Sequence, residues 1–174
     1  MVVTLAVMTS CRSVKVVPQA KSTVKAVSLN ELRLTNQDYS VLNTISAEAT
    51  IHVTYFSDNS IEVRDAENTF SYKLKPMGKK GEGGFMLDNT DGVIRVGFLS
   101  NTSNGVDLTV PEDVSIAVSL YRIIGMSQEM GADGLIEPVI STNIEGTSGS
   151  FGKMNVIYRT TVSAKPVKLK VTGK

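Results

Sequence analysis

One stretch, residues 111–145, constrains the fold of this chain more than any other. It opens with Pro111, whose missing N–H suits a first helical turn, and Glu112 and Asp113 place negative charge at the positive end of the helix dipole. Thr109 is the expected cap. Apolar side chains then recur at three- and four-residue steps on two sides of the predicted helix: Val114, Ile116, Ala117, Val118, Leu120, Tyr121, Ile123 and Ile124. A helix that is apolar on two sides is buried deeply against other elements.

The end of this helix leads directly into a strand. Gly131 is expected to form a left-handed cap, and the apolar residues that follow fall on alternate positions from Ile136 to Ile144. Pro138 within that run indicates an edge strand or a bulge. Gly125 lies inside the helical pattern, where it costs about 1 kcal/mol relative to alanine. We therefore expect a strand or a neighbouring chain to approach the helix closely at Gly125.

The rest of the chain has the pattern of β-strands. Apolar and polar residues recur with a period of two over residues 39–55, with one face buried and one exposed to solvent. The run is unusually long, and single strands usually span about 5–6 residues, so a bend or break is expected near residues 46–49. A hairpin through 65–68 joins strands that begin at Ile61 and Phe70. Shorter strands are predicted at 85–87, 93–99 and 106–110, with a tight turn at 88–92.

A closing hairpin completes the predicted domain. The alternating residues from Met154 to Ala164 pair with Ile136–Ile144 across a flexible loop at 146–152. The parity of apolar residues switches after Lys165-Pro166, which predicts a bulge there. The expected fold class is therefore α+β: a curved, mostly antiparallel sheet with one long helix packed on it.

The composition excludes several functions. The length of 174 residues fits one domain, and a net charge of +1 with a pI of about 7.8 gives no electrostatic footprint for nucleic acid. A single Cys and a single His exclude a disulfide framework and the usual zinc cages. The Gly-rich run 78–84 lacks the Ser or Thr that follows Lys in a phosphate loop, so it predicts a hairpin loop. We predict no cofactor.

His52 does not suggest a catalytic triad. It lies on the solvent-facing parity of its strand, and Glu48 on the same face is about 13 Å away at about 3.3 Å per residue. A triad needs the His held directly by a carboxylate. No catalytic or metal-binding residue is therefore assigned from the sequence.

The N-terminus carries the one predicted site. Residues 1–10 are apolar and uncharged, and Met8-Thr9-Ser10-Cys11 resembles a bacterial lipobox, in which small residues precede a lipid-modified cysteine. A signal peptide normally has a basic start and at least about 15 residues, so residues 1–10 are expected to be a truncated one. The predicted organisation is a truncated signal peptide over 1–10, a lipidated Cys11 and tether over 11–28, and a single α+β domain over 29–174.

Over most of its length the chain resembles uncharacterised lipoproteins of Bacteroidota. The resemblance rests on the lipobox-like start, the apolar helix that ends in Gly131-Ala132-Asp133-Gly134 and leads into a strand, and the final strand through residues 162–168. It implies an outer-membrane lipoprotein. Export to the cell surface in this group tends to follow an acidic stretch after the Cys, and Arg12 and Lys15 depart from that. The resemblance therefore implies a periplasm-facing protein.

Three functions remain open at this stage. The first is a lipid-anchored cell-envelope protein with a binding or structural role, in which an edge strand such as Ile136–Ile144 offers strand addition to a partner. The second is a periplasmic enzyme that uses dispersed carboxylates and hydroxyls; a cleft with two close carboxylates, one of raised pKa, would favour it. The third is a self-associating subunit of an envelope assembly.

Overall fold

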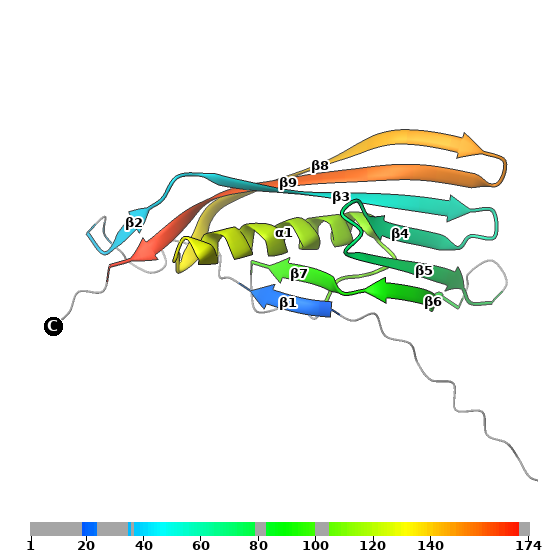
Figure 1. Cartoon of the computed structure of the whole chain (residues 1–174), viewed down its shortest axis with the longest axis horizontal. Helices are drawn as coiled ribbons and strands as arrows, with labels where there is room; N and C mark the ends of the chain where they lie inside the picture. Colours follow the sequence, from blue (N-terminus) through cyan, green and yellow to red (C-terminus); the bar gives the residue numbers. More distant parts are fainter. Residues whose placement is uncertain (1–18, 24–34, 36, 79–82, 100–104, 171–174) are drawn as a thin grey trace, which may run out of the picture.

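The computed structural model describes residues 19–23, 35, 37–78, 83–99 and 105–170 (Figure 1). It confirms an α+β fold with one helix and a curved, mostly antiparallel sheet. The elements in chain order are β1 (Gln19–Thr23), β2 (Tyr39–Val41), β3 (Ile45–Phe56), β4 (Ile61–Asp65), β5 (Phe70–Pro76), β6 (Phe85–Gly92), β7 (Ile94–Phe98), α1 (Pro111–Glu129), β8 (Gly134–Ser150) and β9 (Lys153–Leu169). No helix in these residues is long and apolar enough to cross a membrane.

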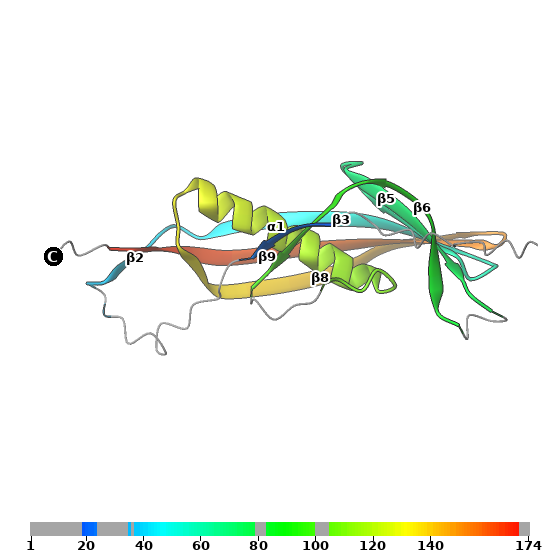
Figure 2. The same cartoon turned by 90° about the horizontal axis from the view of Figure 1, so that it is seen from below.

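The strands form a large and a small layer with the helix between them. The large sheet has seven strands in the order β2-β9-β3-β4-β5-β6, with β8 paired to β9, and all of its pairs are antiparallel. The small layer is β1 paired in parallel with β7. Figures 1 and 2 show α1 running along the β3–β9 face of the large sheet, with β7 and β1 on its other side. The helix therefore packs against both layers, as its two apolar sides predict.

The ends of α1 follow the sequence closely. Pro111 occupies the first turn, and Gly131 adopts a left-handed φ of 69° just beyond the helix. The N–H of Gly131 donates to the carbonyl of Gln128 at 2.9 Å, and that of Ala132 donates to the carbonyl of Ser127 at 3.0 Å. This pair of bonds is a Schellman motif, which satisfies carbonyls that a helix end leaves free.

The expected cap at Thr109 is wrong. The capping residue is Val110, which makes no side-chain bond, and the Thr109 hydroxyl instead donates to Asp107 Oδ1 at 2.7 Å.

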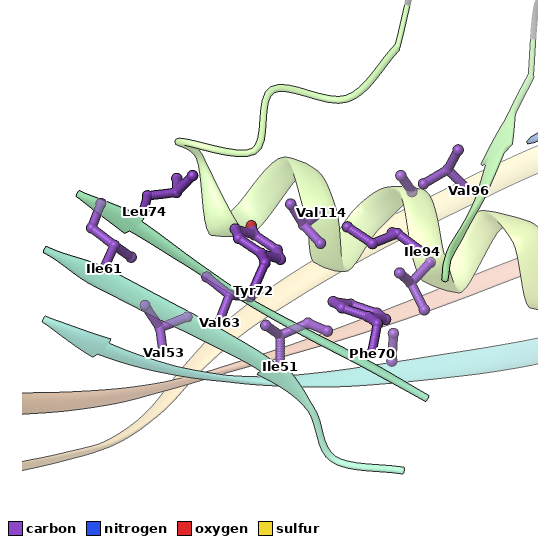
Figure 3. Packing of buried hydrophobic residues seen from close by; sticks show 13 residues of the cluster. Ile51, Val53, Ile61, Val63, Phe70, Tyr72, Leu74, Ile94, Val96 and Val114 are labelled. Carbon is purple, nitrogen blue, oxygen red and sulfur yellow. The ribbon is translucent and has the colours of Figure 1, made fainter. Parts of the chain in front are cut away.

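The core forms two adjoining clusters along the helix. The larger one joins the first half of α1 to β3, β4, β5 and β7 (Figure 3). Its members are Ala49, Ile51, Val53, Ile61, Val63, Phe70, Tyr72, Leu74, Ile94, Val96, Val114, Ala117 and Val118. The second joins the later turns of α1 to β8 and β9 through Leu120, Ile123, Ile124, Leu135, Val162 and Ala164.

The hairpins at 65–68 and 78–84 are confirmed, but the predicted break in the first long strand is misplaced. It lies at residues 42–44, and β3 then runs for 12 residues without interruption. The reason is pairing: β3 lies opposite β9 from Ile45↔Ala164 to Phe56↔Lys153 without a shift in register. A long partner along one whole side, β9, keeps β3 regular without a mid-strand bend.

Several other strand boundaries differ from the prediction. Residues 106–110 form no strand. Residues 88–92 belong to β6 rather than to a tight turn, and residues 89–92 pair with β5. β8 extends to Ser150, so residues 146–150 are strand and the turn is at Phe151-Gly152. A bulge was predicted at Lys165-Pro166, but β9 is continuous there. The extra residue is in its partner β8, between Ile136 and Val139.

The close approach between helix and strand is at Gly97, not at Gly125. A Cβ on Gly97 in β7 would lie 2.7 Å from Tyr121 Cα, whereas a Cβ on Gly125 would meet no described atom within 4 Å. Sequence pattern located a glycine on the helix, but the contact is made by a glycine on the strand that faces it.

Strand β1 lies within the segment 11–28 that was predicted to be a tether. Gln19–Thr23 pairs with Ile94–Phe98, so part of the segment 11–28 belongs to the folded layer under the helix. Cys11 and the expected signal peptide over 1–10 lie outside the described residues.

Candidate functional site

The first candidate site is the free edge of β8 in the large sheet. Among the described residues, β8 pairs with β9 alone over a strand of 17 residues. Two register shifts divide it, between Ile136 and Val139 and between Glu145 and Thr147. The regular segment between them, Val139–Glu145, is named here the β8 edge.

The direction of backbone groups along the β8 edge follows from its partner strand. The Pro166 carbonyl of β9 accepts from Leu42 on the β2–β3 side, while the Val167 carbonyl accepts from Asp133 on the β8 side. The N–H and C=O groups of successive residues point to opposite sides of a strand, so the backbone groups of the odd-numbered residues of β9 point towards β8. The β8 residues opposite even positions therefore point their N–H and C=O outwards: Ile140, Thr142 and Ile144.

The side chains of the β8 edge are apolar and exposed to an unusual degree. Val139 is 62% exposed, Ile144 is 63% exposed and Ile140 is 41% exposed. Natural edge strands are commonly protected by Lys, Pro or bulges. Here Pro138 and the two bulges lie only at the ends, and no Lys, Arg or Pro occurs within Val139–Glu145. The centre of the edge is therefore open to another strand.

The bulge between Ile136 and Val139 has a local cause. Pro138 has no N–H to give to the ladder, and Glu137 before it adopts a left-handed φ of 52°. Lys165 of β9 donates to the Glu137 carboxylate at 2.6 Å. The bulge thus marks the point where β8 leaves the covered core and begins its exposed run.

Hydroxyl groups connect the β8 edge to the helix. Ser115 Oγ donates to Thr160 Oγ1 at 2.6 Å, and Thr160 Oγ1 lies 3.0 Å from Thr142 Oγ1. Ser115 and Thr160 are buried. On the opposite face, Arg159 lies 3.3 Å from a Glu48 oxygen and 3.4 Å from a Glu145 oxygen. These contacts link the middle of β8 to β9 and, through Thr160, to α1.

An open groove of about 700 Å³ lies over β3, β4, β8 and β9, and it is the second candidate. His52 and Arg64 line it, and the Arg64 guanidinium lies 3.6 Å from the Glu62 carboxylate. Both ends of that ion pair are exposed to solvent. Such pairs contribute little, and a shallow groove lined by them lacks the enclosed polar groups of a typical small-molecule site.

Asp65 lines the same groove, but both of its carboxylate oxygens have partners within the fold. Its side chain is fully buried, and it accepts a hydrogen bond from the Thr69 hydroxyl at 2.7 Å. Arg122 of α1 lies 3.5 Å from the other Asp65 oxygen and 2.8 Å from Glu67, and it donates to the Glu48 carbonyl. This Arg122 clamp ties the helix to β3 and to the β4–β5 turn.

Three aspartates have pKa values below the usual range. Hydrogen bonds from Thr35 lower the pKa of Asp38, those from Ser60 lower the pKa of Asp58, and those from Thr109 lower the pKa of Asp107. A general acid near neutral pH needs the opposite shift.

Two tyrosines have pKa values above the usual range. Burial raises the pKa of Tyr55 and of Tyr72. The Tyr72 hydroxyl donates to the Leu108 carbonyl at 2.9 Å, so its proton is engaged in a structural bond.

The structure thus distributes the residues that the sequence singled out. His52 lies in the groove, Cys11 is outside the described residues, and no group of three potential metal ligands occurs in the part of the chain that the structure describes. Sequence reasoning missed the Arg122 clamp. The available signal was a lone Arg inside the apolar helical run, between Tyr121 and Ile123.

Comparison with known proteins adds no assignment: no family model, curated protein or solved structure matches this chain.

Proposed function

We propose that this chain is a lipid-anchored cell-envelope protein whose domain binds an extended protein segment by strand addition to the β8 edge. The observation that carries the proposal is the combination of outward backbone groups at Ile140, Thr142 and Ile144 with exposed apolar side chains at the same place. Main-chain bonds supply affinity in strand addition, and alternate side chains supply specificity.

The size of the β8 edge predicts a weak complex. Three outward residues offer two backbone groups each, hence about six hydrogen bonds, and a typical net contribution is about 0.5–1.5 kcal/mol per bond. Association itself costs several kcal/mol. Anchoring by Cys11 at a membrane raises the effective concentration of a partner held in the same envelope, which compensates for a small interface.

Site-specific photo-crosslinking in cells tests the strand addition. A photoreactive amino acid in place of Ile144 is expected to give one discrete adduct, whose crosslinked peptide is an extended segment of the partner. The same probe at Leu169, 44% exposed in β9, serves as the control. The adduct should disappear when Ile140→Lys adds a charge to the edge. Equal adducts from both positions, or an adduct that survives Ile140→Lys, would contradict the proposal.

A second copy of the chain is the alternative partner that one observation favours. Antiparallel pairing of two β8 edges about Thr142 places Ile140 opposite Ile144 of the other copy, on the same face of the joined sheet. Sedimentation of the purified protein separates the two cases. A dimer abolished by Ile144→Lys would assign the edge to self-association.

A further inference from the structure

The hairpin turns of the large sheet gather at one end of the molecule. Figure 1 shows the β3–β4 and β8–β9 turns, the end of β5 and the start of β6 at the same end of the molecule, opposite the end where β9 finishes at Leu169. The Ser57 N–H of the first turn donates to the Gly152 carbonyl of the third at 2.9 Å. At this hairpin end the β3–β4 and β8–β9 turns are therefore in direct contact.

Apolar side chains project from the hairpin end into solvent. Phe151 at the β8–β9 turn is fully exposed, with a relative exposure of 111%, and Met77, Met86 and Met154 are each between 42% and 49% exposed. Single exposed apolar residues are normal, but here a fully exposed Phe and three exposed Met side chains lie at or beside the ends of strands that meet at one end of the molecule.

Cationic side chains accompany these apolar groups. The Lys73 ammonium lies 4.4 Å from the centre of the Phe56 ring, and the Lys153 ammonium lies 5.2 Å from it on the other hairpin. An apolar tip flanked by Lys fits the boundary between lipid headgroups and acyl chains, where aromatic rings enter and ammonium groups remain with the phosphates.

The position of β1 sets how far Cys11 can reach. Gln19 lies opposite Ile94, and the nine residue steps from Ile94 back to Phe85 at the hairpin end span about 30 Å. Cys11 precedes Gln19 by eight residue steps, which reach at most about 29 Å. The N-terminal end of β1 also points towards the hairpin end, away from Leu169 (Figures 1 and 2). A lipid on Cys11 can therefore lie nearly level with the hairpin end.

From these observations we infer that the hairpin end faces the membrane and that the Phe151 ring enters the lipid surface. The inference deepens the proposed anchoring, since a short tether from Cys11 holds this end near the bilayer. It leaves β8 running away from the membrane, with its edge accessible to a partner.

The composition of the chain allows a direct test. The sequence contains no Trp and a single Cys, so Phe151→Trp places a unique fluorophore at the tip, and Cys11 can be coupled to a maleimide lipid in vesicles. The matched control is Leu169→Trp at the opposite end. Vesicles of phosphatidylethanolamine and phosphatidylglycerol, with and without brominated acyl chains, report the depth of the indole. Chemical coupling makes the test independent of native lipidation and of any partner for β8.

The two variants are expected to behave differently. The Phe151→Trp emission should shift to shorter wavelength on vesicles, and brominated lipid should quench it at least about twofold more than the Leu169→Trp emission. Equal quenching of the two variants, or a Phe151→Trp emission unchanged from that in buffer, would overturn the inference. Unfolding curves of both variants check that each retains the fold. Failure here with a lipidated native Cys11 would refute the orientation and leave the proposed anchoring intact.

Discussion

Two Gly→Ala substitutions should change stability in opposite directions. Gly97 in β7 has the backbone of α1 directly above it: a Cβ there would lie 2.5 Å from the Leu120 carbonyl carbon and 2.7 Å from Tyr121 Cα. Real Cβ atoms essentially never lie closer than 3.0 Å to another heavy atom. The strand and the helix must therefore separate by roughly 1 Å in a region that is otherwise closely packed.

The magnitude follows from what has to move. Overpacking in a well-packed core typically costs about 1–3 kcal/mol, and Gly97→Ala should lie near the upper end because the opposing atoms are backbone rather than flexible side chains. Gly125→Ala meets no described atom within 4 Å and removes a helix-interior glycine, so it should stabilise by about 0.5–1 kcal/mol.

Urea unfolding measures both changes. With a slope of about 2 kcal/mol per molar, Gly97→Ala should lower the midpoint by about 1 M or more, and Gly125→Ala should raise it by about 0.3–0.5 M, with unchanged slopes. A neutral Gly97→Ala would refute the close helix–strand contact. If Gly125→Ala lowered stability as much as Gly97→Ala, the close contact would lie at Gly125 on the helix, as the sequence predicted.

Three further predictions concern charged and phenolic groups. Arg122→Met should lower the unfolding free energy by about 2–3 kcal/mol, because the buried Asp65 keeps only its Thr69 bond, and a double-mutant cycle with Asp65→Asn in urea should show coupling between the two sites. The pKa of Asp107 is lower in the folded protein than in the unfolded chain, where it is about 3.9. The ionised carboxylate therefore stabilises the fold above about pH 4, and this contribution is lost as pH falls through the folded-state pKa. Asp107→Asn should make the loss of stability measured below about pH 4 less steep. The raised pKa values of Tyr55 and Tyr72 mean that the stability these two residues contribute is complete below about pH 10 and falls as pH rises further, and ultraviolet titration should show two phenols ionising above the ordinary value of about 10.

The sequence predicted the elements with strong periodicity and the fold class they compose. The helix over Pro111–Glu129 and its Gly131 cap are local features, set by residue spacing and by the conformational freedom of glycine. The β3–β4 turn is local as well, since Asn59 adopts a left-handed φ of 61° and Asp58 accepts a bond from the Ser60 N–H at 2.9 Å. Such features need no knowledge of distant partners.

The misplaced features all depend on contacts between distant segments. The unbroken β3 is maintained by β9, which lies more than 90 residues further along the chain, and the close approach at Gly97 exists only because β7 crosses α1. The Arg122 clamp unites α1 with the turn after β4. Pro138 did indicate an edge strand or a bulge over Ile136–Ile144, and β8 has both, but the register that exposes Ile140 and Ile144 depends on its pairing with β9.

The measurement that tests the central claim most directly is mass spectrometry of the N-terminal peptide. The gene would be expressed in a Gram-negative host with its native upstream region, and the membrane fraction would be digested and analysed. The account predicts a diacyl or triacyl adduct on Cys11, with residues 1–10 removed. An intact Met1 preceding an unmodified Cys11 thiol would contradict the lipid anchor, and the proposed envelope location with it.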